Sequence, residues 1–548
     1  MQNTLYYGDN LAILRDREYF THSSVDLIYL DPPFNSNRSY NVLFKQESGE
    51  DSEAQIQAFD DTWHWAGAAA TYHELLTVTD GKVGEMIGAL HSVLGENPMM
   101  AYLVMMAARL VELHRVLKPT GSLYLHCDPT ASHYLKVVLD TIFGPHLFLN
   151  EIVWQRTGAH NDARRFGRIN DSLLFYAKSE RYTFNPQYTE YAEEYVKERY
   201  RYSDSDGRLY WANTMTAAGP GPTRIFRGVE KQPPVGSHWR FSQAEIDRME
   251  QDGHIYYSKA GMPYVKSYLD ERKGRPVQSL WTDIVMSKSG SERLGYQTQK
   301  PVALLERIVA ASSNPGDVVL DPFCGCGTSI AAAQKLGRTW IGIDVTHLAI
   351  SLQKYRLKAA FGIEDGKDYA VVGEPQDLAS AEQLANDNRY QFQWWALSLV
   401  KARPLGGEEG SKQGKKGADK GIDGQIIFIE DNTGKPKKVL VQVKSGNVNR
   451  ATVGELRGTV EREGAAIGVL ITLEPATKPM LAEAAAAGFY ETLHWGNFPR
   501  LQVLTVEDLL HRAKRLEMPP QRQTAITFKQ APKEKPKSAA KQAGLGLE

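Results

Sequence analysis

Short apolar runs with the length of buried strands recur along the first two thirds of the chain. An unbroken apolar run of four to eight residues is typical of a strand covered on both faces. Apolar residues three and four apart predict a helix with one buried side. Strands are predicted at residues 25–30, 122–126, 318–321 and 340–344, and helices at 99–117, at 133–143 and from 329 onward. Residues 318–344 therefore form a strand–helix–strand unit.

The strand predicted at residues 25–30 has an unusual ending. Pro32 and Pro33 lack the N–H that a central strand needs, so the strand stops at Asp31. This leaves a carboxylate, a rigid turn and Phe34 at the carboxyl end of the strand, where ligands of open α/β sheets bind. Four residues alone are weak evidence, because a strand followed by a simple proline turn has the same pattern.

The unit at residues 318–344 has a glycine-rich first turn. Asp321 ends its first strand, Gly325 and Gly327 lie in the turn, and Asp344 ends its second strand. The glycines let the backbone approach a ligand closely. Asp344 is placed to accept both hydroxyls of a ribose. Asp321 would repel a pyrophosphate, so the turn favours a cationic ligand, such as one with an amino group and a sulfonium.

Two further segments accompany these strands. Gly8-Asp9-Asn10 precedes a short helical pattern, which predicts Asn10 as the N-cap of a helix. Taken alone, Asp9 is expected to be part of that cap. Gln299-Lys-Pro301 precedes a helix predicted through residues 304–309.

Residues 155–285 differ in composition from the segments around them. Tyrosines and a tryptophan alternate there with basic residues between positions 182 and 211, and four arginines come earlier, at 156, 164, 165 and 168. Such a mixture suits a groove that holds a phosphate backbone and stacks bases. A solvated helix with tyrosines packed on a core has the same composition, and both interpretations stay open.

The bulk composition narrows the class of protein. With 548 residues, two or three domains are expected. Because 64 basic residues balance 65 acidic ones, any basic surface must be local. Cys127, Cys324 and Cys326 are too few for a disulfide scaffold and suit a reducing cytoplasm. The sequence has no signal-peptide pattern, membrane-spanning run or ATP-binding phosphate loop, so we expect a cytoplasmic protein without a membrane partner or a motor.

The two blocks around Asp31 and Asp321 together resemble the amino-methylating DNA methyltransferases of the N6-adenine/N4-cytosine family, over residues 1–365. Asp31-Pro-Pro-Phe34 is similar to the family's catalytic tetrapeptide, and the segment from Asp321 to Thr328 is similar to its S-adenosylmethionine loop. The catalytic block comes first, as in the family's β-type order. The resemblance implies a Rossmann-like, mostly parallel sheet with helices on both faces, S-adenosylmethionine as cofactor, and double-stranded DNA as partner.

The same resemblance implies roles for individual residues. Asp31 and the carbonyl of Pro32 would accept the two N–H groups of an exocyclic amine, held by Pro33, and Phe34 would stack on a base flipped out of the duplex. Residues 155–285 become the candidate target-recognition region. The implied cofactor residues are Asp9, Lys300, Asp321, Phe323, Gly325, Gly327, Thr328 and Asp344. Family members that methylate cytosine N4 often carry Ser where Asp31 stands, so adenine is favoured and N4-cytosine is the alternative.

The last third of the chain has a second pattern of its own. A basic, glycine-rich loop at 410–420 precedes a predicted strand at 422–429, a turn at 431–434 and a strand at 439–444. Gln442 and Lys444 are two residues apart, so both point to one face of the strand, while Val441 and Val443 point to a core. A helix at 453–463 and a buried strand at 467–473 follow.

This hairpin resembles the Mrr-type nucleases of the restriction-endonuclease-like class, over residues 385–515. The resemblance implies that Asp423 and Gln442 bind Mg²⁺, and that Lys444 stabilises the hydroxide which hydrolyses a phosphodiester. Gln442 stands where the wider superfamily has an acid, which lowers the charge of the site. A solvated hairpin with an ordinary lysine is the other interpretation. Residues 516–548 are predicted to be a disordered basic tail.

The leading hypothesis is a site-specific adenine-N6 DNA methyltransferase fused to a Mg²⁺-dependent endonuclease, as in restriction–modification. A methyltransferase whose C-terminal domain only binds DNA or a partner is the second hypothesis. A nuclease that cuts modified DNA is the third. Self-association into a homodimer is left open.

Overall fold

The computed structural model describes residues 1–33, 39–45, 51–60, 65–78, 81–158, 164, 166–285, 299–405, 422–429, 436–492, 494–520 and 527. Several predictions lie outside these residues. They concern Phe34, Arg165, the basic loop at 410–420, the turn at 431–434 and most of the tail at 516–548. The described part of the chain forms a large unit and a second unit within residues 186–278.

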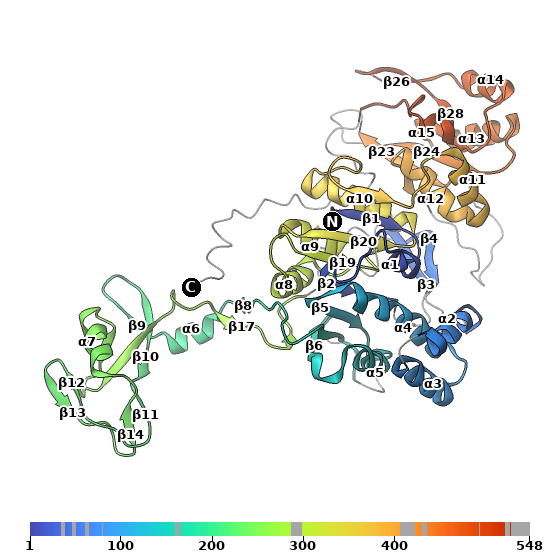
Figure 1. Cartoon of the computed structure of the whole chain (residues 1–548). Coiled ribbons are helices and arrows are strands. Elements are labelled where there is room, and N and C mark those ends of the chain that lie inside the picture. Colours follow the sequence, from blue (N-terminus) through green and yellow to red (C-terminus); the bar gives the residue numbers. More distant parts are fainter. Residues whose placement is uncertain are drawn as a thin grey trace. The chain divides into compact units, whose positions relative to one another are not determined.

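A nine-stranded sheet forms the centre of the large unit in the described part of the chain, in the order β18-β6-β7-β5-β2-β19-β20-β1-β21 (Figure 1). Only β7 runs antiparallel to its neighbours. The strands are β1 (Thr4–Tyr7), β2 (Val25–Leu30), β5 (Leu117–Cys127), β6 (Phe148–Gln155), β7 (Asn170–Ala177), β18 (Leu280–Trp281), β19 (Val318–Asp321), β20 (Thr339–Asp344) and β21 (Ala370–Val372).

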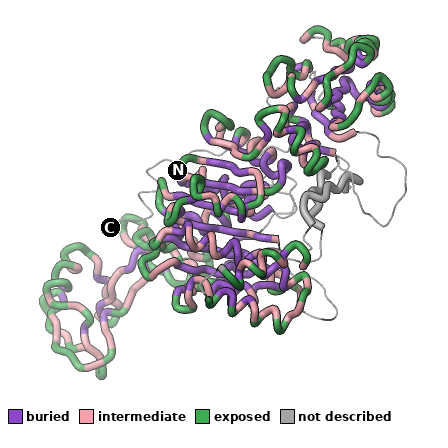
Figure 2. The backbone as a smooth tube through the Cα atoms, turned by 45° about the vertical axis from the view of Figure 1, so that its right-hand side comes forward, coloured by how far each residue is buried: buried purple, intermediate pink, exposed green. Residues whose placement is uncertain are grey.

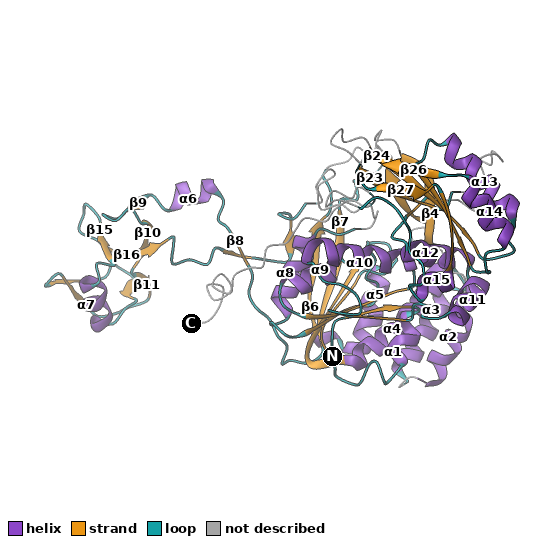
Figure 3. Ribbon diagram, turned by 90° about the horizontal axis from the view of Figure 1, so that it is seen from above, coloured by secondary structure: helices purple, strands orange, loops and turns teal. Residues whose placement is uncertain are grey.

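Helices cover both faces of this sheet, as expected of parallel strands. Figure 3 shows α8, α9 and α10 grouped together and apart from α1, α2, α3 and α4. One continuous core joins the second group and α5 to the sheet, and Figure 2 shows the strands as the buried layer. The helices are α1 (Asn10–Arg15), α2 (Trp65–Val78), α3 (Lys82–Leu94), α4 (Pro98–Val116), α5 (Ser132–Phe143), α8 (Val302–Ser312), α9 (Thr328–Lys335) and α10 (His347–Phe361).

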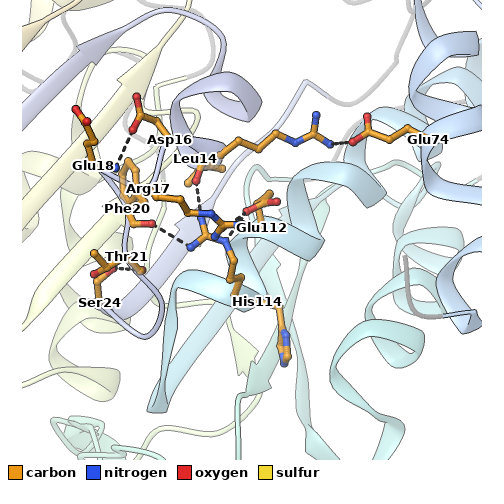
Figure 4. A network of polar contacts seen from close by, with 12 residues as sticks. Leu14, Asp16, Arg17, Glu18, Phe20, Thr21, Ser24, Glu74, Glu112 and His114 are labelled. Atoms are coloured by element: carbon orange, nitrogen blue, oxygen red, sulfur yellow. Dashed lines mark hydrogen bonds and ion pairs between the residues drawn. The ribbon is translucent and has the colours of Figure 1, made fainter. Parts of the chain in front are cut away.

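The loop that leads into β2 is fixed by α4. Arg115 donates to the carbonyl oxygens of Leu14 at 2.5 Å and Phe20 at 3.0 Å, and its Nε donates to Glu112 at 2.6 Å (Figure 4). One guanidinium thus satisfies two backbone carbonyls of the loop. The amino end of β2 is held by this network, and the carboxyl end of the same strand carries Asp31.

The second unit is built from short strands and two helices. A four-stranded antiparallel sheet has the order β15-β16-β10-β9. Its elements are α6 (Glu193–Arg199), β9 (Tyr202–Ser203), β10 (Leu209–Thr214), β11 (Thr216–Ala218), β12 (Arg224–Phe226), β13 (Val229–Lys231), β14 (Ser237–Trp239), α7 (Gln243–Gln251), β15 (Ile255–Tyr257) and β16 (Pro263–Tyr268). Three shorter pieces lie outside both sheets of the large unit: the hairpin of β3 (Ser39–Lys45) with β4 (Asp51–Asp60), the pair of β8 (Tyr188–Thr189) with β17 (Arg275–Pro276), and a 3-10 turn at Pro145–Leu147.

The C-terminal part forms a separate sheet of the order β22-β23-β24-β25-β28, with helices on both faces. One core packs α12 against it and the other packs α13 and α14. The elements are α11 (Leu378–Asp387), α12 (Arg389–Leu399), β22 (Arg403–Pro404), β23 (Gly424–Ile429), β24 (Pro436–Lys444), α13 (Arg450–Arg462), β25 (Ile467–Thr472), α14 (Lys478–Ala486), β26 (Phe489–Thr492), β27 (Gly496–Pro499), β28 (Leu501–Thr505) and α15 (Val506–Leu510).

Most predicted elements are present with shifts of a few residues at their ends. The strand at 25–30 has the predicted limits, and the helix predicted at 99–117 spans Pro98–Val116. The predicted N-cap was wrong by one position. Asp9 caps α1, accepting from Leu11 N at 2.8 Å and Ala12 N at 3.2 Å, and Asn10 is the first helical residue.

Candidate active site

Four neighbouring parallel strands, β2, β19, β20 and β1, bring their carboxyl ends to one edge of the sheet. Asp31 follows β2, Asp321 ends β19, Asp344 ends β20, and Asp9 follows β1. The register places Asp321 opposite Gly342 and Tyr7 opposite Asp344. Residues predicted from segments about 300 positions apart are therefore neighbours at the edge where α/β sheets bind ligands. We call this edge the acidic edge.

Asp31 is paired with a cation at this edge. Its Oδ2 accepts from Lys300 Nζ, and both side chains are largely buried, at 15% and 10% exposure. Pro32 is buried and Pro33 is half-buried. Lys300, which the sequence resemblance assigns to the cofactor, thus contacts the predicted catalytic carboxylate.

The glycine-rich turn is held by side chains from α10. Gln353 Nε2 donates to Gly325 O at 2.7 Å, and Arg356 donates to Cys326 O at 3.1 Å. Gly327 has a φ of 73°, and a Cβ there would lie 2.8 Å from Gln353 Cγ. Only glycine fits this position without a shift of its neighbours. No sequence pattern pointed to the two α10 residues, whose partners lie about 30 positions away.

Asp321 and Asp344 are carboxyl groups placed in low-dielectric surroundings. Burial raises the pKa of Asp321 to about 7 despite its hydrogen bonds from Ser329 Oγ and Phe323 N, and the charges of Asp31 and Asp344 add to the rise. Burial also raises the pKa of Asp344. Ionised carboxylates at such a position are stabilised by a nearby cation.

The carboxylate of Asp344 is oriented by the turn that it would share with a ligand. Thr346 donates to its Oδ1 through N and Oγ1, both at 2.9 Å, and Gly325 N donates to Oδ2 at 2.9 Å. The last bond joins β20 directly to the glycine-rich turn. Phe323 and Thr328 complete the turn, with Thr328 as the first residue of α9.

Asp9 both caps α1 and pairs with a buried arginine. Its Oδ1 caps α1, and its Oδ2 accepts from the buried Arg109 at 2.7 Å. Arg109 Nε also donates to Asn10 Oδ1 at 2.5 Å, and Asn10 Nδ2 donates to Pro322 O at 2.7 Å. This chain connects the cap to the glycine-rich turn. With 53% of its side chain exposed, Asp9 keeps a surface for a ligand.

These features fit S-adenosylmethionine. The glycine-rich turn without a Cβ at Gly327 lets the backbone approach the cofactor closely. The buried carboxyl groups favour its sulfonium and amino groups, and the oriented acid next to the turn can accept its ribose hydroxyls. The fit rests on Gly327, Asp321 and Asp344.

A buried polar chain next to β2 was missed by the sequence interpretation. Tyr29 on β2 bonds His126 on β5 at 2.9 Å, and His126 Nε2 contacts Asp171 Oδ2 at 3.2 Å. Arg156 Nη1 lies 3.4 Å from Asp171 Oδ1. His126 ends a strand that was predicted only as buried, and a histidine in such a run was the available signal.

The tyrosines of the second unit pack largely on one another and on cations. Arg199 lies 3.5 Å from the ring centroid of Trp211, and Arg208 lies 3.9 Å from that of Tyr268 while bonding Asp270 at 2.8 Å. Tyr195 and Tyr202 are exposed. The packed tyrosines agree with that part of the second interpretation, and a groove for a phosphate backbone stays a prediction.

The three C-terminal residues singled out from the sequence lie close together. Asp423, just before β23, accepts from Val443 N at 2.6 Å, so its carboxylate lies beside Gln442 and Lys444 on β24. Val441 and Val443 belong to the core with α12, as predicted. Gln442 is 4% exposed, and its Oε1 has no hydrogen-bond partner in the described structure.

This arrangement offers few ligands for a metal ion. One carboxylate and one unpartnered amide oxygen suit a hydrated Mg²⁺, which accepts few protein ligands. Within the described ranges, no group of three or more His, Cys, Asp and Glu side chains could hold a metal ion. In the same ranges, no helix is long and apolar enough to cross a bilayer. All three cysteines are free and buried, as expected without disulfides.

Comparison with known families gives two matches along the chain. The N6/N4 methyltransferase model, described as DNA methylase, matches residues 25–353. A model described as NACHT-associated inactive Restriction Endonuclease 1 matches residues 408–511. The first match covers more than half of the chain, and the second coincides with the C-terminal sheet.

Individual relatives agree with the first match. Type II methyltransferase M.EcaI of Enterobacter cloacae is 29% identical over 349 residues, covering 63% of this chain and 67% of the relative. DNA adenine methyltransferase YhdJ of Escherichia coli is 25% identical, covering 65% of this chain and 83% of the relative. Two others are covered over only 50% and 64% of their length, so the chain spans between half and two thirds of several relatives. The solved PvuII cytosine-N4-specific DNA methyltransferase is 13% identical, covering 64% of this chain and 86% of that chain, with a TM-score of 0.30.

Proposed function

The chain belongs to the N6/N4 DNA methylase family, and from this premise we propose that it methylates the N6 amine of adenine in DNA with S-adenosylmethionine as donor. The observation that carries the proposal is the position of Asp31 at the carboxyl end of β2, beside the glycine-rich turn that ends β19. A methyl acceptor held by Asp31 and a cofactor held by that turn would meet at one edge of the sheet.

The residues at this edge explain how a weak nucleophile could react. The lone pair of an exocyclic amine is delocalised into the ring. Asp31 and the carbonyl of Pro32 would accept its two N–H groups, bias the nitrogen toward a tetrahedral geometry and expose the lone pair. The rigid turn makes these acceptors preorganised. When bound, S-adenosylmethionine supplies an electrophilic methyl group on a sulfonium. Asp31 then favours the positive charge that develops on the nitrogen.

Adenine is preferred over cytosine for two reasons. The resemblance associates an aspartate at this position with adenine more often than with cytosine N4, and one relative is named a DNA adenine methyltransferase. The alternative is N4-cytosine methylation, which uses the same acceptor geometry. Sequencing that distinguishes N6-methyladenine from N4-methylcytosine, applied to DNA from cells expressing the chain, gives the base and the recognition site together.

Asp31→Ala tests the catalytic assignment. We expect the variant to lose methyl transfer to DNA and keep S-adenosylmethionine binding, because Asp31 would act on the substrate amine. Asp26→Asn is a matched control, since Asp26 lies on β2, the strand that Asp31 follows, is 13% exposed and pairs with a lysine, Lys118, at 2.7 Å. Transfer that survives in Asp31→Ala, or is lost equally in Asp26→Asn, would contradict the assignment.

A second proposal concerns Asp423, Gln442 and Lys444. They support Mg²⁺-dependent cleavage of DNA, with Asp423 and Gln442 as the residues that would hold the ion and Lys444 beside the scissile phosphate. When bound, Mg²⁺ supplies an activated water. The alternative is a domain that only binds DNA or a partner, which the single carboxylate and the name of the matching family, describing inactive endonucleases, support.

Plasmid nicking decides between these two functions of the C-terminal domain. Purified protein with Mg²⁺ should nick unmethylated plasmid, and Asp423→Asn should abolish the nicking. Asp508→Asn is the control, because Asp508 lies in the same domain and pairs with Lys514 at 2.8 Å, away from β24. Nicking that is absent from the wild type, or unchanged in Asp423→Asn, would leave DNA or partner binding as the function. The rate of nicking is then compared between methylated and unmethylated plasmid. Nicking of the methylated plasmid alone would indicate a nuclease specific for modified DNA.

A further inference from the structure

A chain of polar side chains crosses three strands of the large sheet below the acidic edge. Tyr29 Oη and His126 Nδ1 are 2.9 Å apart, and His126 Nε2 and Asp171 Oδ2 are 3.2 Å apart. His126 and Asp171 have side-chain exposures of 0% and 1%. The ring of Trp154 packs edge-on against His126 at 5.6 Å. The chain ends at Arg156, whose Nη1 is 3.4 Å from Asp171 Oδ1.

The chemistry of these groups gives the chain one direction. An ionised carboxylate only accepts, so His126 Nε2 donates to Asp171, and His126 Nδ1 faces the Tyr29 hydroxyl on the other side of the ring. Burial alone would raise the pKa of Asp171, but the hydrogen bond and charge of His126, with the charges of Lys300 and Arg156, hold that pKa below its usual value. Asp171 is therefore a buried anion, which is costly to maintain without a partner.

Strand direction places the end of this chain at the acidic edge. β6 runs parallel to β2 and β5, so Arg156, directly after β6, lies at the same edge as Asp31. Asp171 lies there because the antiparallel β7 begins at that edge. In the order β6-β7-β5-β2, three strand spacings of about 4.8 Å, about 14 Å in total, separate β6 from β2. The register places Asp31 level with Ile152, so Arg156 lies four residues further out at this edge than Asp31.

Arg156 is the one member of this chain of polar side chains that is open to solvent, whereas Tyr29, His126 and Asp171 are buried. Its side chain is 41% exposed, whereas that of Asp171 is 1% exposed. A guanidinium has five N–H donors, and a contact to Asp171 on one side leaves the others facing outward. A cation held by a buried anion is preorganised, so it loses little side-chain entropy when it binds a second anion.

We propose that Arg156 binds a backbone phosphate of the DNA strand beside the target base, and that Asp171, His126 and Tyr29 are positioning residues that hold it there. The inference rests on the proposed function, because it assumes that DNA lies across the acidic edge. Tyr29 is two residues before Asp31 on one strand, so the chain fixes the phosphate contact relative to the catalytic carboxylate. A phosphate contact positions the strand without reading its sequence.

Arg156→Gln in the full chain tests the phosphate contact. Binding to a mixed-sequence duplex is measured over a series of salt concentrations. Loss of one phosphate contact should lower the slope of log Kd against log salt by about 0.9. It should weaken DNA binding at low salt by about tenfold, the usual size of one charge-assisted hydrogen bond. Arg156→Lys keeps a positive charge and should restore the slope. Binding of S-adenosylmethionine should be unchanged in both variants.

Arg15→Gln is the matched control. Arg15 ends α1, is 39% exposed and pairs with Glu74 at 2.6 Å, so it resembles Arg156 in exposure and in having an acidic partner. Its position at the far end of α1 from Asn10 takes it away from the acidic edge. The salt slope of this variant should equal that of the wild type.

Asp171→Asn tests the positioning role through a double-mutant cycle. If Asp171 acts by holding Arg156, the Asp171→Asn substitution should weaken DNA binding when made in the wild type. The same substitution should have little further effect when made in Arg156→Gln. An equal effect in both backgrounds would mean a purely structural role and would overturn the positioning role. Should Asp171→Asn not fold, Tyr29→Phe replaces it in the same cycle.

The outcomes separate the inference from the function on which it rests. A wild-type protein that transfers no methyl group to DNA would remove the proposed function. A wild type that methylates DNA, with an unchanged salt slope and affinity in Arg156→Gln, would overturn the inference alone.

Discussion

Replacing Asp321 by Asn should stabilise the ligand-free protein at neutral pH and weaken its binding of a cationic cofactor. The carboxyl group is 3% exposed, and burial together with Asp31 and Asp344 raises its pKa from 3.8 to about 7. The unfolded chain loses this proton near pH 3.8, and the folded protein keeps it until about pH 7. Between these values the folded state binds more protons, so wild-type stability falls as pH rises.

The size of the effect follows from that pKa. A rise from 3.8 to about 7 corresponds to about 4 kcal/mol of lost stability once both states are ionised. The amide of the Asp321→Asn variant has no such ionisation. The difference in unfolding free energy between the variant and the wild type should therefore grow by about 2.5 kcal/mol between pH 5 and pH 7.5, in favour of the variant. Lost hydrogen bonds from Ser329 and Phe323 reduce the absolute difference at each pH and change its pH dependence little.

The assay is urea unfolding of the ligand-free protein at both pH values, followed by near-UV signals of the large unit. Asp317→Asn is the control, because Asp317 precedes the same strand at its other end and accepts from Asn314 N at 2.7 Å. A difference between variant and wild type that is equal at pH 5 and pH 7.5 would refute the assignment of a raised pKa to Asp321.

Cofactor binding provides the second measurement on the same variant. With a pKa of about 7, about a tenth of the Asp321 carboxyls are ionised at pH 6 and about nine tenths at pH 8. If the ionised form binds the cationic cofactor, wild-type affinity should be about tenfold higher at pH 8 than at pH 6. This tenfold change should be absent from Asp321→Asn, which should bind weakly at both pH values.

Three further substitutions have defined outcomes. Gly327→Ala should destabilise the protein by about 2 kcal/mol and weaken cofactor binding, because φ is 73° and the new Cβ would lie 2.8 Å from Gln353 Cγ. Thermal unfolding measures the loss of stability, and cofactor titration measures the loss of binding. Gly458→Ala, on α13 with no atom within 4 Å of the added Cβ, should instead stabilise by about 0.5–1 kcal/mol, and equal effects at the two glycines would contradict this reasoning. Burial and the charge of Lys178 lower the pKa of His114 from 6.5 to about 4, so wild-type stability should fall as pH drops from 6.5 toward 4, and His114→Gln should remove that part of the acid sensitivity in melting curves.

The acidic edge could be predicted from the sequence because its signals are local. A buried strand that ends in Asp31 and two prolines, and a glycine turn between Asp321 and Asp344, depend on residues next to one another in the chain. Parallel strands then bring both segments to one edge without any further information. The same reasoning placed Gln442 and Lys444 on one face of β24, and Val441 and Val443 in a core.

Contacts between distant side chains could not be predicted in this way. Tyr29 and His126 are 97 positions apart, and Asn10 and Arg109 are 99 apart. The N-cap error has the same origin, since Asp9 and Asn10 are both good caps and only the contacts of Asn10 with Arg109 and Pro322 decide between them. The periodicity of apolar residues predicts which face of a helix or strand a side chain occupies. It does not predict which distant side chain that residue contacts.

The second unit is shorter than the aromatic and basic region that the composition singled out. The aromatic and basic region was predicted to start at residue 155, yet the second unit begins at Pro186. The residues between belong to β7 and its connections, because Asn170–Ala177 is a buried strand that pairs with β5 and β6. Likewise β21 extends the large sheet beyond residue 365 to Val372.

The charges at the acidic edge explain why this site is costly to the fold. Lys300 neutralises Asp31, whereas Asp321 and Asp344 form no ion pair with a described side chain, and both have raised pKa values. A bound sulfonium and amino group would favour the ionised forms of these two acids, so part of the binding free energy comes from stabilising charges that burial disfavours in the fold. Local instability of this kind is common where a site must favour its ligand over the empty state. The order of strands creates it, because it buries Asp321 and Asp344 at the ends of two neighbouring parallel strands.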